Sequence, residues 1–167
     1  MNKIKLRTNN FFFEISGFGN VNGNFWLGLE ALHQLTSLGT VTLRFDLIRN
    51  DGAAGYAEYS NFNILSESSD YKLTFGSYTG NIGDGMLYSK DMKFSTYDQD
   101  NDRASWNCAH SWRGGWWHND CFRACLNNGY YNSTEIDENL PGRMSWSQWD
   151  QVFGDITFSE MKLRRET

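Results

Sequence analysis

The sequence predicts a single domain that mixes short strands with little helix and carries a long loop-rich region in its second half. Three observations indicate this fold class. The 167 residues suit one domain with a substantial core. Short runs of alternating apolar and polar residues are separated by turns of Gly, Asn and Asp. Between about Gly80 and Gly154 this periodicity is lost, while Trp pairs and all three cysteines crowd together.

Strands are predicted first where the alternation is clearest. Residues 41–47 alternate as a half-buried strand does, and residues 55–59 and 71–75 alternate as well. Asn50-Asp51-Gly52 is a hairpin turn signal between the first two runs. Near the end of the chain, residues 156–158 and 161–164 together predict a closing strand.

One helix is predicted from Leu27 to Leu38. Its apolar face would carry Leu29, Leu32 and Leu35, and Gly39 would supply the stop at its C-terminus.

Composition excludes several function classes. The formal net charge is −5 and no Lys/Arg cluster occurs, which argues against nucleic acids and anionic membranes as main partners. No apolar run approaches transmembrane length, and the first residues lack the apolar core of a signal peptide. The sequence contains no P-loop, G-x-S-x-G or H-E-x-x-H motif. We therefore expect neither membrane insertion nor an enzyme.

An acidic segment, Asp98-Gln99-Asp100-Asn101-Asp102, is a candidate metal site. Three carboxylates at alternate positions repel one another unless a cation lies among them, and Ca²⁺ prefers such oxygen ligands. The segment is not an EF-hand, because Arg103 and Ala109 stand where that loop needs Gly and Glu. A solvated acidic turn without a metal is the alternative.

The cysteines lie close together in the loop-rich region. Cys108 and Cys121 would close a short loop, which a disulfide would stabilise by roughly 3 kcal/mol in the chain-entropy model. Zinc is the alternative, since His110 and His118 stand near these two cysteines. Cys125 is left over from an odd count.

Tryptophans gather in the same region. Clustered Trp rings offer apolar faces with polar edges, so they could form a platform for carbohydrate or acetyl groups. For most of them a place in the core is the simpler interpretation. Trp112 is singled out as a ligand residue because it falls in a polar, Gly-rich loop. The alternative for the whole region, a disordered insert, is disfavoured by its aromatic density.

Several of these stretches together resemble the fibrinogen C-terminal globular domain, which fibrinogen chains, ficolins, tachylectins, tenascins and angiopoietins share. The most specific one reads Phe-Ser-Thr-Tyr-Asp-Gln-Asp-Asn-Asp over residues 94–102, followed by Asn-Cys-Ala at 107–109 and Gly-Trp-Trp at 115–117. The matching stretches run in order through residues 17–20, 24–30, 43–47, 56–59, 92–102, 107–109, 115–117, 126–127, 130–131 and 160–164.

The resemblance implies an α+β fold with a central twisted antiparallel sheet, short helices and a loop-rich subdomain that carries calcium and ligand. Residues 1–167 would then form one fibrinogen-like domain that lacks the family's usual N-terminal subdomain. Its central sheet region would comprise residues 14–79 and 155–165, and its calcium- and ligand-binding subdomain residues 80–154.

The resemblance also implies a calcium site. The side chains of Asp100 and Asp102 and the backbone carbonyls of Ala104 and Trp106 match the family's ligands, while Asp98 lies outside this set. An extracellular setting, which the family implies, favours a Cys108–Cys121 disulfide over zinc.

In ficolin-like relatives the peptide bond before the second cysteine is cis and shapes an acetyl-binding site. The matching pocket residues here are Trp112, Asp120, Cys121 and Phe122, although Phe122 replaces the family's usual His. The stretch 132–143 does not align with the loop that completes that pocket.

The function implied is a secreted, calcium-dependent, lectin-like module that binds acetylated or other glycans on microbial or cell surfaces in innate immune pattern recognition. The alternative is a protein-binding adhesion, matrix or signalling module of the tenascin and angiopoietin type, with extracellular proteins as partners. Homo-oligomerisation is left open.

Overall fold

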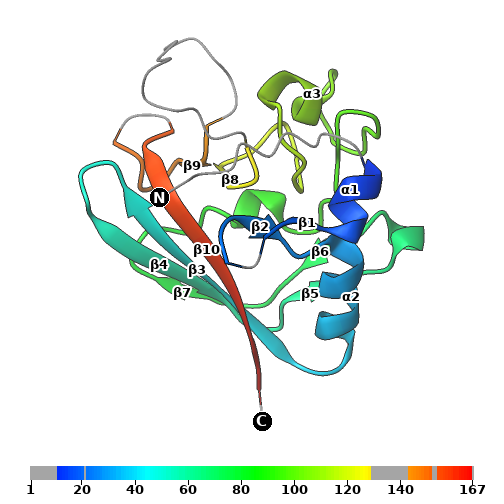
Figure 1. Ribbon diagram of the computed structural model, residues 1–167, viewed down its shortest axis with the longest axis horizontal. Helices are drawn as coiled ribbons and strands as arrows, with labels where there is room; N and C mark the ends of the chain where they lie inside the picture. The colour runs from blue at the N-terminus through cyan, green and yellow to red at the C-terminus, as the bar shows by residue number, and fades with distance from the viewer. Residues whose placement is uncertain (1–10, 21, 129–142, 152–153, 167) are drawn as a thin grey trace.

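The computed structural model describes residues 11–20, 22–128, 143–151 and 154–166. A four-stranded antiparallel sheet in the order β10-β3-β4-β7 forms one side of the molecule, and short helices and loops lie around it (Figure 1). The strands of this sheet are β3 (Val41–Arg49), β4 (Ala54–Tyr59), β7 (Tyr78–Gly80) and β10 (Ile156–Arg165).

The predicted hairpin forms as the turn signal indicates. Gly52 adopts a φ of 83°, and its N–H donates to the carbonyl of Arg49 at 3.0 Å. The register then places Phe45 opposite Ala57 on β4 and opposite Met161 on β10. The two halves of the predicted closing strand are one continuous strand, which pairs with β3 along its length with a single register shift between Ile156 and Phe158.

Two element predictions need correction. The run 71–75 yields only the short strand β6 (Leu73–Thr74), because Asp70 and Tyr71 have φ values of 52° and 49°, outside the extended region. β7 was not predicted, although it extends the main sheet beside β4.

The predicted helix is α2 (Leu29–Ser37), two residues shorter at its start and one at its end. Leu29 and Leu32 are buried as expected, but Leu35 is 42% exposed. At 100° per residue, position 36 rather than 35 returns to the face of Leu29, and Thr36 is buried there.

Short elements connect these parts. They are α1 (Phe11–Ser16), β1 (Phe18–Gly19), β2 (Phe25–Trp26), β5 (Asn63–Ile64), η1 (Glu67–Ser69), η2 (Leu87–Ser89), α3 (Cys108–Trp112), β8 (Ala124–Cys125) and β9 (Ser145–Trp146). The strands among them pair as β1-β2, β5-β6 and β8-β9. None of the described helices is long and apolar enough to cross a membrane.

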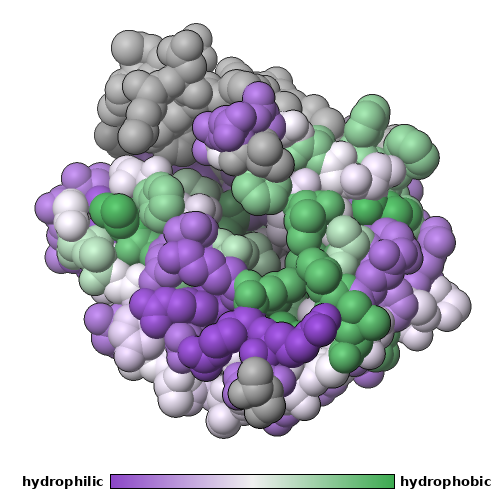
Figure 2. All heavy atoms as spheres, turned by 60° about the horizontal axis from the view of Figure 1, so that its bottom comes forward, coloured by the Kyte–Doolittle hydropathy of each residue, from purple (hydrophilic) through white to green (hydrophobic). Residues whose placement is uncertain are grey.

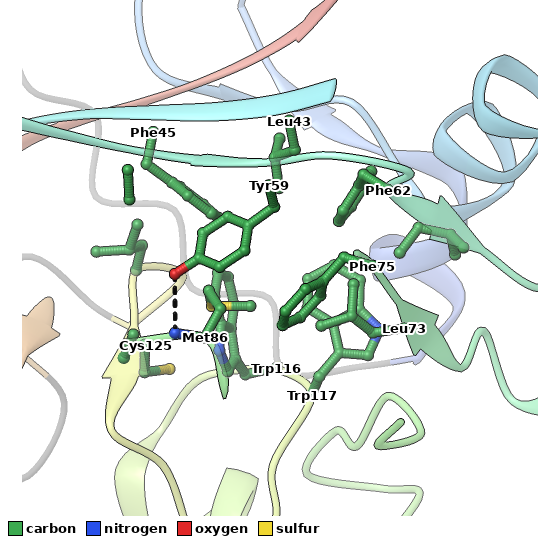
Figure 3. Close-up of a cluster of buried hydrophobic side chains, with 14 of the residues drawn as sticks. Leu43, Phe45, Tyr59, Phe62, Leu73, Phe75, Met86, Trp116, Trp117 and Cys125 are labelled. Carbon is green, nitrogen blue, oxygen red and sulfur yellow. Dashed lines mark hydrogen bonds between the residues drawn. The ribbon is translucent and has the colours of Figure 1, made fainter. Parts of the chain in front are cut away.

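An aromatic core joins the sheet to the loop-rich region (Figure 3). Phe45 and Tyr59 project from the sheet toward Trp116 and Trp117, which come from the loops, and all four are fully buried. The Trp117 indole donates to the carbonyl of Tyr71 at 2.8 Å. Core packing is therefore the role of Trp116 and Trp117, and a disordered insert is excluded for the described part of this region.

Candidate functional site

The acidic segment begins with a residue that has a structural role. One carboxylate oxygen of Asp98 accepts from the Thr96 hydroxyl at 2.8 Å and from the N–H of Phe11 at 2.9 Å. Asp98 thus attaches the start of the loop to the first residue of α1, which agrees with its place outside the expected calcium set.

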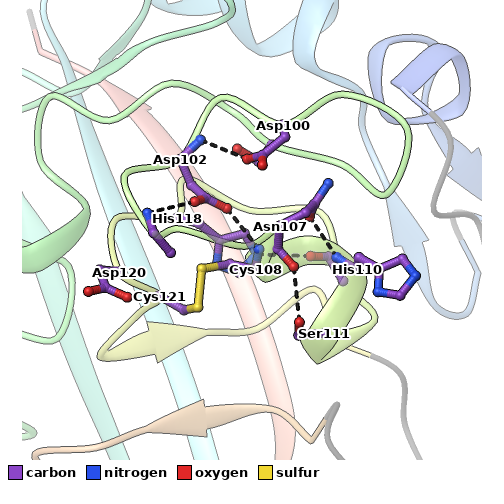
Figure 4. Close-up of a disulfide and its surroundings, with 12 residues drawn as sticks. Asp100, Asp102, Asn107, Cys108, His110, Ser111, His118, Asp120 and Cys121 are labelled. Atoms are coloured by element: carbon purple, nitrogen blue, oxygen red, sulfur yellow. Dashed lines mark hydrogen bonds between the residues drawn. A yellow bond between two sulfur atoms is a disulfide. The ribbon is translucent and has the colours of Figure 1, made fainter.

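The next two aspartates face each other (Figure 4). Asp100 accepts from the N–H of Asp102 at 3.2 Å, and Asp102 accepts from the N–H groups of Ala104 at 2.9 Å and Cys108 at 2.8 Å. Burial raises the pKa of Asp102, the two N–H donors lower it, and the neighbouring Asp100 raises it further. Two mutually repelling carboxylates side by side could supply part of the oxygen donor set that calcium prefers.

No cluster of three or more His, Cys, Asp or Glu suited to a metal occurs among the described residues. An ion in this loop would therefore depend on carbonyls as well as carboxylates, which is the composition expected from Asp100, Asp102, Ala104 and Trp106. The calcium site stays a prediction.

Cys108 and Cys121 form the expected disulfide, with 5.5 Å between their Cα atoms. Zinc was the wrong alternative, because both sulfurs are used in the disulfide and the nearby histidines have other contacts. His110 is exposed and stacks on Tyr97, with 4.4 Å between ring centroids. His118 is buried, bonds through Nε2 to the carbonyl of Gly114 at 3.0 Å, and has a pKa lowered by burial to about 4.

The helix that carries Cys108 is positioned by local signals. Asn107 caps α3 by accepting from the N–H of His110 at 2.8 Å. Arg113 ends the helix in the left-handed conformation with φ 58°. The intervening five residues place Trp112 at the last helical position, from which its ring meets that of Phe122 edge to face at 5.2 Å.

These rings belong to a pocket of about 210 Å³ lined by Trp106, Trp112, Asp120, Cys121 and Phe122. The peptide bond between Asp120 and Cys121 is cis. The structure thus brings all four expected ligand residues together around one cavity. Whether they bind a ligand stays a prediction.

The sequence analysis missed one residue that lines the pocket and one that contacts the lining. Trp106 was expected to supply only a carbonyl, yet its side chain lines the pocket and is 56% exposed. Tyr88 donates its hydroxyl to the carbonyl of Asp120 at 3.0 Å. A large aromatic side chain in a polar, Asp-rich loop is the signal that could have identified Trp106. The sequence offers no comparable signal for Tyr88.

The stretch 132–143, which was expected not to align with the family loop that completes the pocket, lies outside the described residues except for Arg143.

Cys125 is free, fully buried on β8, and its thiol bonds to the side chain of Asn128 at 3.1 Å. The thiol therefore has no access to a second chain in this fold.

Comparison with known proteins agrees with the fold. The family model for the C-terminal globular domain of fibrinogen beta and gamma chains matches residues 9–166. This chain belongs to the fibrinogen C-terminal domain family. Human Tenascin-R is 41% identical over 148 residues, which are 89% of this chain and 10% of that protein.

Solved family members share the architecture. The fibrinogen-like globe domain of human ANGPTL2 aligns with a TM-score of 0.88 and 33% identity, over 93% of this chain and 72% of that one. Lamprey fibrin D-dimer complexed with the peptide Gly-His-Arg-Pro-amide aligns with a TM-score of 0.87 and 27% identity, over 98% of this chain and 58% of that one. The α+β, fibrinogen-like fold class is thereby confirmed.

Proposed function

We propose that this chain is an extracellular, non-enzymatic recognition module that holds part of a protein partner in the pocket beside a calcium-binding loop. The observation that carries the proposal is the meeting of Trp106, Trp112, Asp120, Cys121 and Phe122 around one cavity. At about 210 Å³ the cavity is smaller than the usual 300–1,000 Å³ of small-molecule sites. It suits the end of one side chain, with further contacts made by the surrounding surface.

A protein partner is favoured over a glycan by the kind of relatives this chain has. It is similar to a tenascin and to an angiopoietin-related domain, and the lamprey relative is complexed with a short peptide. The chain spans about a tenth of the length of Tenascin-R.

Catalysis has no support in the geometry. The Cys125 thiol is buried with its pKa raised by burial, and the His118 imidazole bonds to a backbone carbonyl. A nucleophile needs an adjacent base within hydrogen-bonding reach, and this pair provides none among the contacts of the described residues.

Calcium is the proposed cofactor. Asp100 and Asp102 would supply carboxylates and Ala104 and Trp106 carbonyls, with waters completing six to eight oxygens. With so few charged ligands we expect a dissociation constant on the order of 10⁻⁴ to 10⁻³ M. The ion would hold the backbone of Trp106, and with it one wall of the pocket.

Thermal unfolding with and without calcium tests the cofactor. A dissociation constant of about 10⁻³ M predicts roughly 1.4 kcal/mol of stabilisation at about 10 mM calcium, a rise of about 3–5 °C. Asp100→Asn should abolish most of this rise, and Asp98→Asn, the matched control in the same loop, should keep it. An unmoved wild-type melting curve would show that the loop is an ordinary acidic turn.

Acetylated glycans are the second candidate, favoured by the aromatic corner that Trp112 and Phe122 make, because sugars pack their apolar faces on such rings. A glycan array, run with and without calcium, separates the two functions. If the chain binds acetylated sugars and no protein ligand, glycan recognition would replace protein binding as its function.

A further inference from the structure

Strand β10 lies at the edge of the main sheet, and among the described strands it pairs with β3 alone (Figure 1). The N–H of Glu166 donates to the carbonyl of Thr40 at 2.9 Å, so the even-numbered residues of β10 turn their backbone groups toward β3. The N–H and C=O groups of Ser159, Met161 and Leu163 therefore point away from the sheet. In the part of the chain that the structure describes, no backbone–backbone hydrogen bond reaches them.

An open edge of this length is a template for another strand, and proteins usually protect such edges with charges, bulges or proline. β10 contains no proline, and its register shifts only near its start, between Ile156 and Phe158. Protection of the regular part would thus depend on the charges of Glu160, Lys162 and Arg164, which are exposed on the outer face of the sheet.

The charges of β10 fit the neighbouring strand of their own chain poorly. The register places Glu160 opposite Asp46 and Lys162 opposite Arg44, so each faces a like charge, which destabilises a cross-strand pair. Lys162 reaches diagonally to Asp46 instead, at 2.8 Å. Glu160 forms its ion pair with Lys162 of the same strand at 3.0 Å. Both side chains stay about half exposed, so a further partner can reach them.

A second copy of β10 offers the opposite charges. If the two strands run antiparallel about a two-fold axis at Met161, positions equally far from Met161 lie opposite each other. Glu160 of each copy then faces Lys162 of the other, and Phe158 faces Arg164. Opposite charges that face each other across two strands are favourable, and so is a guanidinium beside an aromatic ring.

The backbone groups match in the same arrangement. Met161 of one copy meets Met161 of the other, and Ser159 meets Leu163, so the outward N–H and C=O groups of both strands find partners. The charged residues then occupy the non-hydrogen-bonded positions, where facing side chains come closest.

The two adjacent registers lack this match. An axis at Glu160 would bring the Glu160 side chains of both copies face to face, and an axis at Lys162 would do the same with two lysines. Like charges directly opposite each other are destabilising. The charges of β10 therefore favour one register of a second copy, instead of only repelling any strand that approaches.

The surface around the strand suits partial burial. β10 runs toward the bottom of Figure 1, and the view that brings this side forward shows a strongly hydrophilic band beside apolar patches (Figure 2). Phe158 and Ile48, which lie opposite each other on β10 and β3, are both exposed large apolar side chains. A second strand along β10 would cover part of Phe158.

We propose that two copies of this chain associate along β10, with a two-fold axis at Met161, and join their sheets into one continuous antiparallel sheet. The interface is small, so the dimer should be weak and should form in proportion to concentration. This inference goes beyond the proposed recognition function. It would place two recognition modules in one assembly, which raises the apparent affinity for a ligand that carries two binding sites.

Sedimentation velocity between about 5 and 500 μM, a range that suits a small interface, tests the association. The wild type should shift from monomer toward dimer as its concentration rises. Raising the salt from about 0.05 to 0.5 M should weaken the dimer at least about threefold, because exposed charge pairs are screened. Hydrogen exchange at the amides of Met161 and Leu163 should slow with concentration, and exchange at Lys162, whose amide already faces β3, should change less.

Charge reversal assigns the effect to the strand. Glu160→Lys makes both facing pairs repulsive and should weaken the dimer at least about tenfold. The double variant Glu160→Lys/Lys162→Glu makes them attractive again and should return to within about threefold of the wild type. It also faces opposite charges on β3, so its fold should be kept. Glu67→Lys, an exposed position on η1, is the control with the same change in net charge and should dimerise like the wild type.

A backbone variant tests the pairing itself. Ser159→Pro removes an outward N–H and leaves the bonds to β3 in place, and proline is tolerated at such edge positions. It should weaken the dimer at least about fivefold, because each copy loses a hydrogen bond to the other. If Ser159→Pro does not fold, the charge-reversal variants decide alone.

Cysteines test the register. In an equal mixture of Glu160→Cys and Lys162→Cys chains, one of them isotope-labelled, mild oxidation should give a mixed disulfide dimer. The two positions would lie about 4.5 Å apart between Cα atoms, within the range of a disulfide. The mixed dimer keeps one Glu160–Lys162 pair, and the buried Cys125 does not compete. Either variant alone should link much less.

Other results would overturn the proposal. A protein that stays monomeric over the whole concentration range has no such interface. A dimer that Glu160→Lys and Ser159→Pro leave unchanged has its interface elsewhere. Slow exchange of the Met161 amide in the monomer would show that the chain covers this edge itself. Equal linking of either cysteine variant alone and of the mixture would contradict the register.

Discussion

The carboxyl group of Glu14 is buried in the interior beside Asn127, and its titration should give stability a strong pH dependence. Glu14 is only 1% exposed, and the amide of Asn127 donates to both of its oxygens at 3.1 Å. The same amide also reaches the carbonyl of Gly115, next to the two core tryptophans. Burial raises the pKa of Glu14 to about 8, partly offset by the bond from Asn127.

The magnitude follows from the two protonation states. In the folded protein Glu14 keeps its proton up to about pH 8, whereas in the unfolded chain it ionises near pH 4.5. Between these values the folded state binds more protons, so stability is fully present below the unfolded pKa and is lost as pH rises through the folded pKa. The loss is about 1.4 kcal/mol per pH unit, and about 5 kcal/mol over the whole interval, as an order of magnitude.

Urea unfolding of the wild type and of Glu14→Gln, measured at several pH values between about 5.5 and 8.5, tests this reasoning. Gln stays neutral, and its amide oxygen can still accept from Asn127. The free energy of unfolding of the wild type should fall relative to that of the variant by roughly 1.4 kcal/mol per pH unit. Above about pH 8 this difference should stay constant. Glu67→Gln, at an exposed position, should not change the slope. A wild-type-minus-variant difference that is flat with pH would refute the burial argument.

Two further predictions concern the core. Leu29→Ala should lower the free energy of unfolding by about 2–5 kcal/mol, because Leu29 is buried. Leu35→Ala, on the exposed side of the same helix, should change it by less than about 0.5 kcal/mol. Equal effects of the two substitutions in urea titrations would contradict the observed helix face. The Cys125 thiol should be unreactive toward a thiol reagent in the folded protein and react once it is unfolded, since it is fully buried and burial raises its pKa. A disulfide-linked dimer on a non-reducing gel would contradict this placement.

The sheet could be predicted from the sequence wherever burial follows a simple period. β3 and β4 alternate and are joined by a Gly turn, so local pattern and tertiary environment agree. The error at Leu35 arose because Leu29, Leu32 and Leu35 were assigned to one helix face. The buried face consists of positions 29, 32 and 36 instead. The strand expected at 71–75 failed because a left-handed backbone at Tyr71, which nothing in the residue type signals, interrupts it.

The site was predicted residue by residue from a family resemblance, and its limits have a physical cause. Resemblance transfers positions, and Asp120 and Phe122 do line one pocket, although ligand binding there stays a prediction. It does not tell where a side chain points when the family uses only the backbone carbonyl at that position. The ring of Trp106 was missed for that reason. The contact between Tyr88 and Asp120 spans 32 residues and has no periodic or motif signature.

The arrangement also explains how a loop region without long elements can hold a defined site. The segment that leads into the acidic loop pairs with the core, since Ser95 and Trp116 exchange backbone hydrogen bonds at 2.9 and 3.1 Å. Farther along, Arg103 donates its N–H to the carbonyl of Asn119 at 2.9 Å, and the disulfide ties Cys108 to Cys121. The loop that would bind calcium and the turn that carries Asp120 are therefore joined at two points, and the start of the loop is anchored to the core at a third. An ion that fixes Asp100 and Asp102 would limit the motion of the pocket through these same connections, without requiring a change in the sheet.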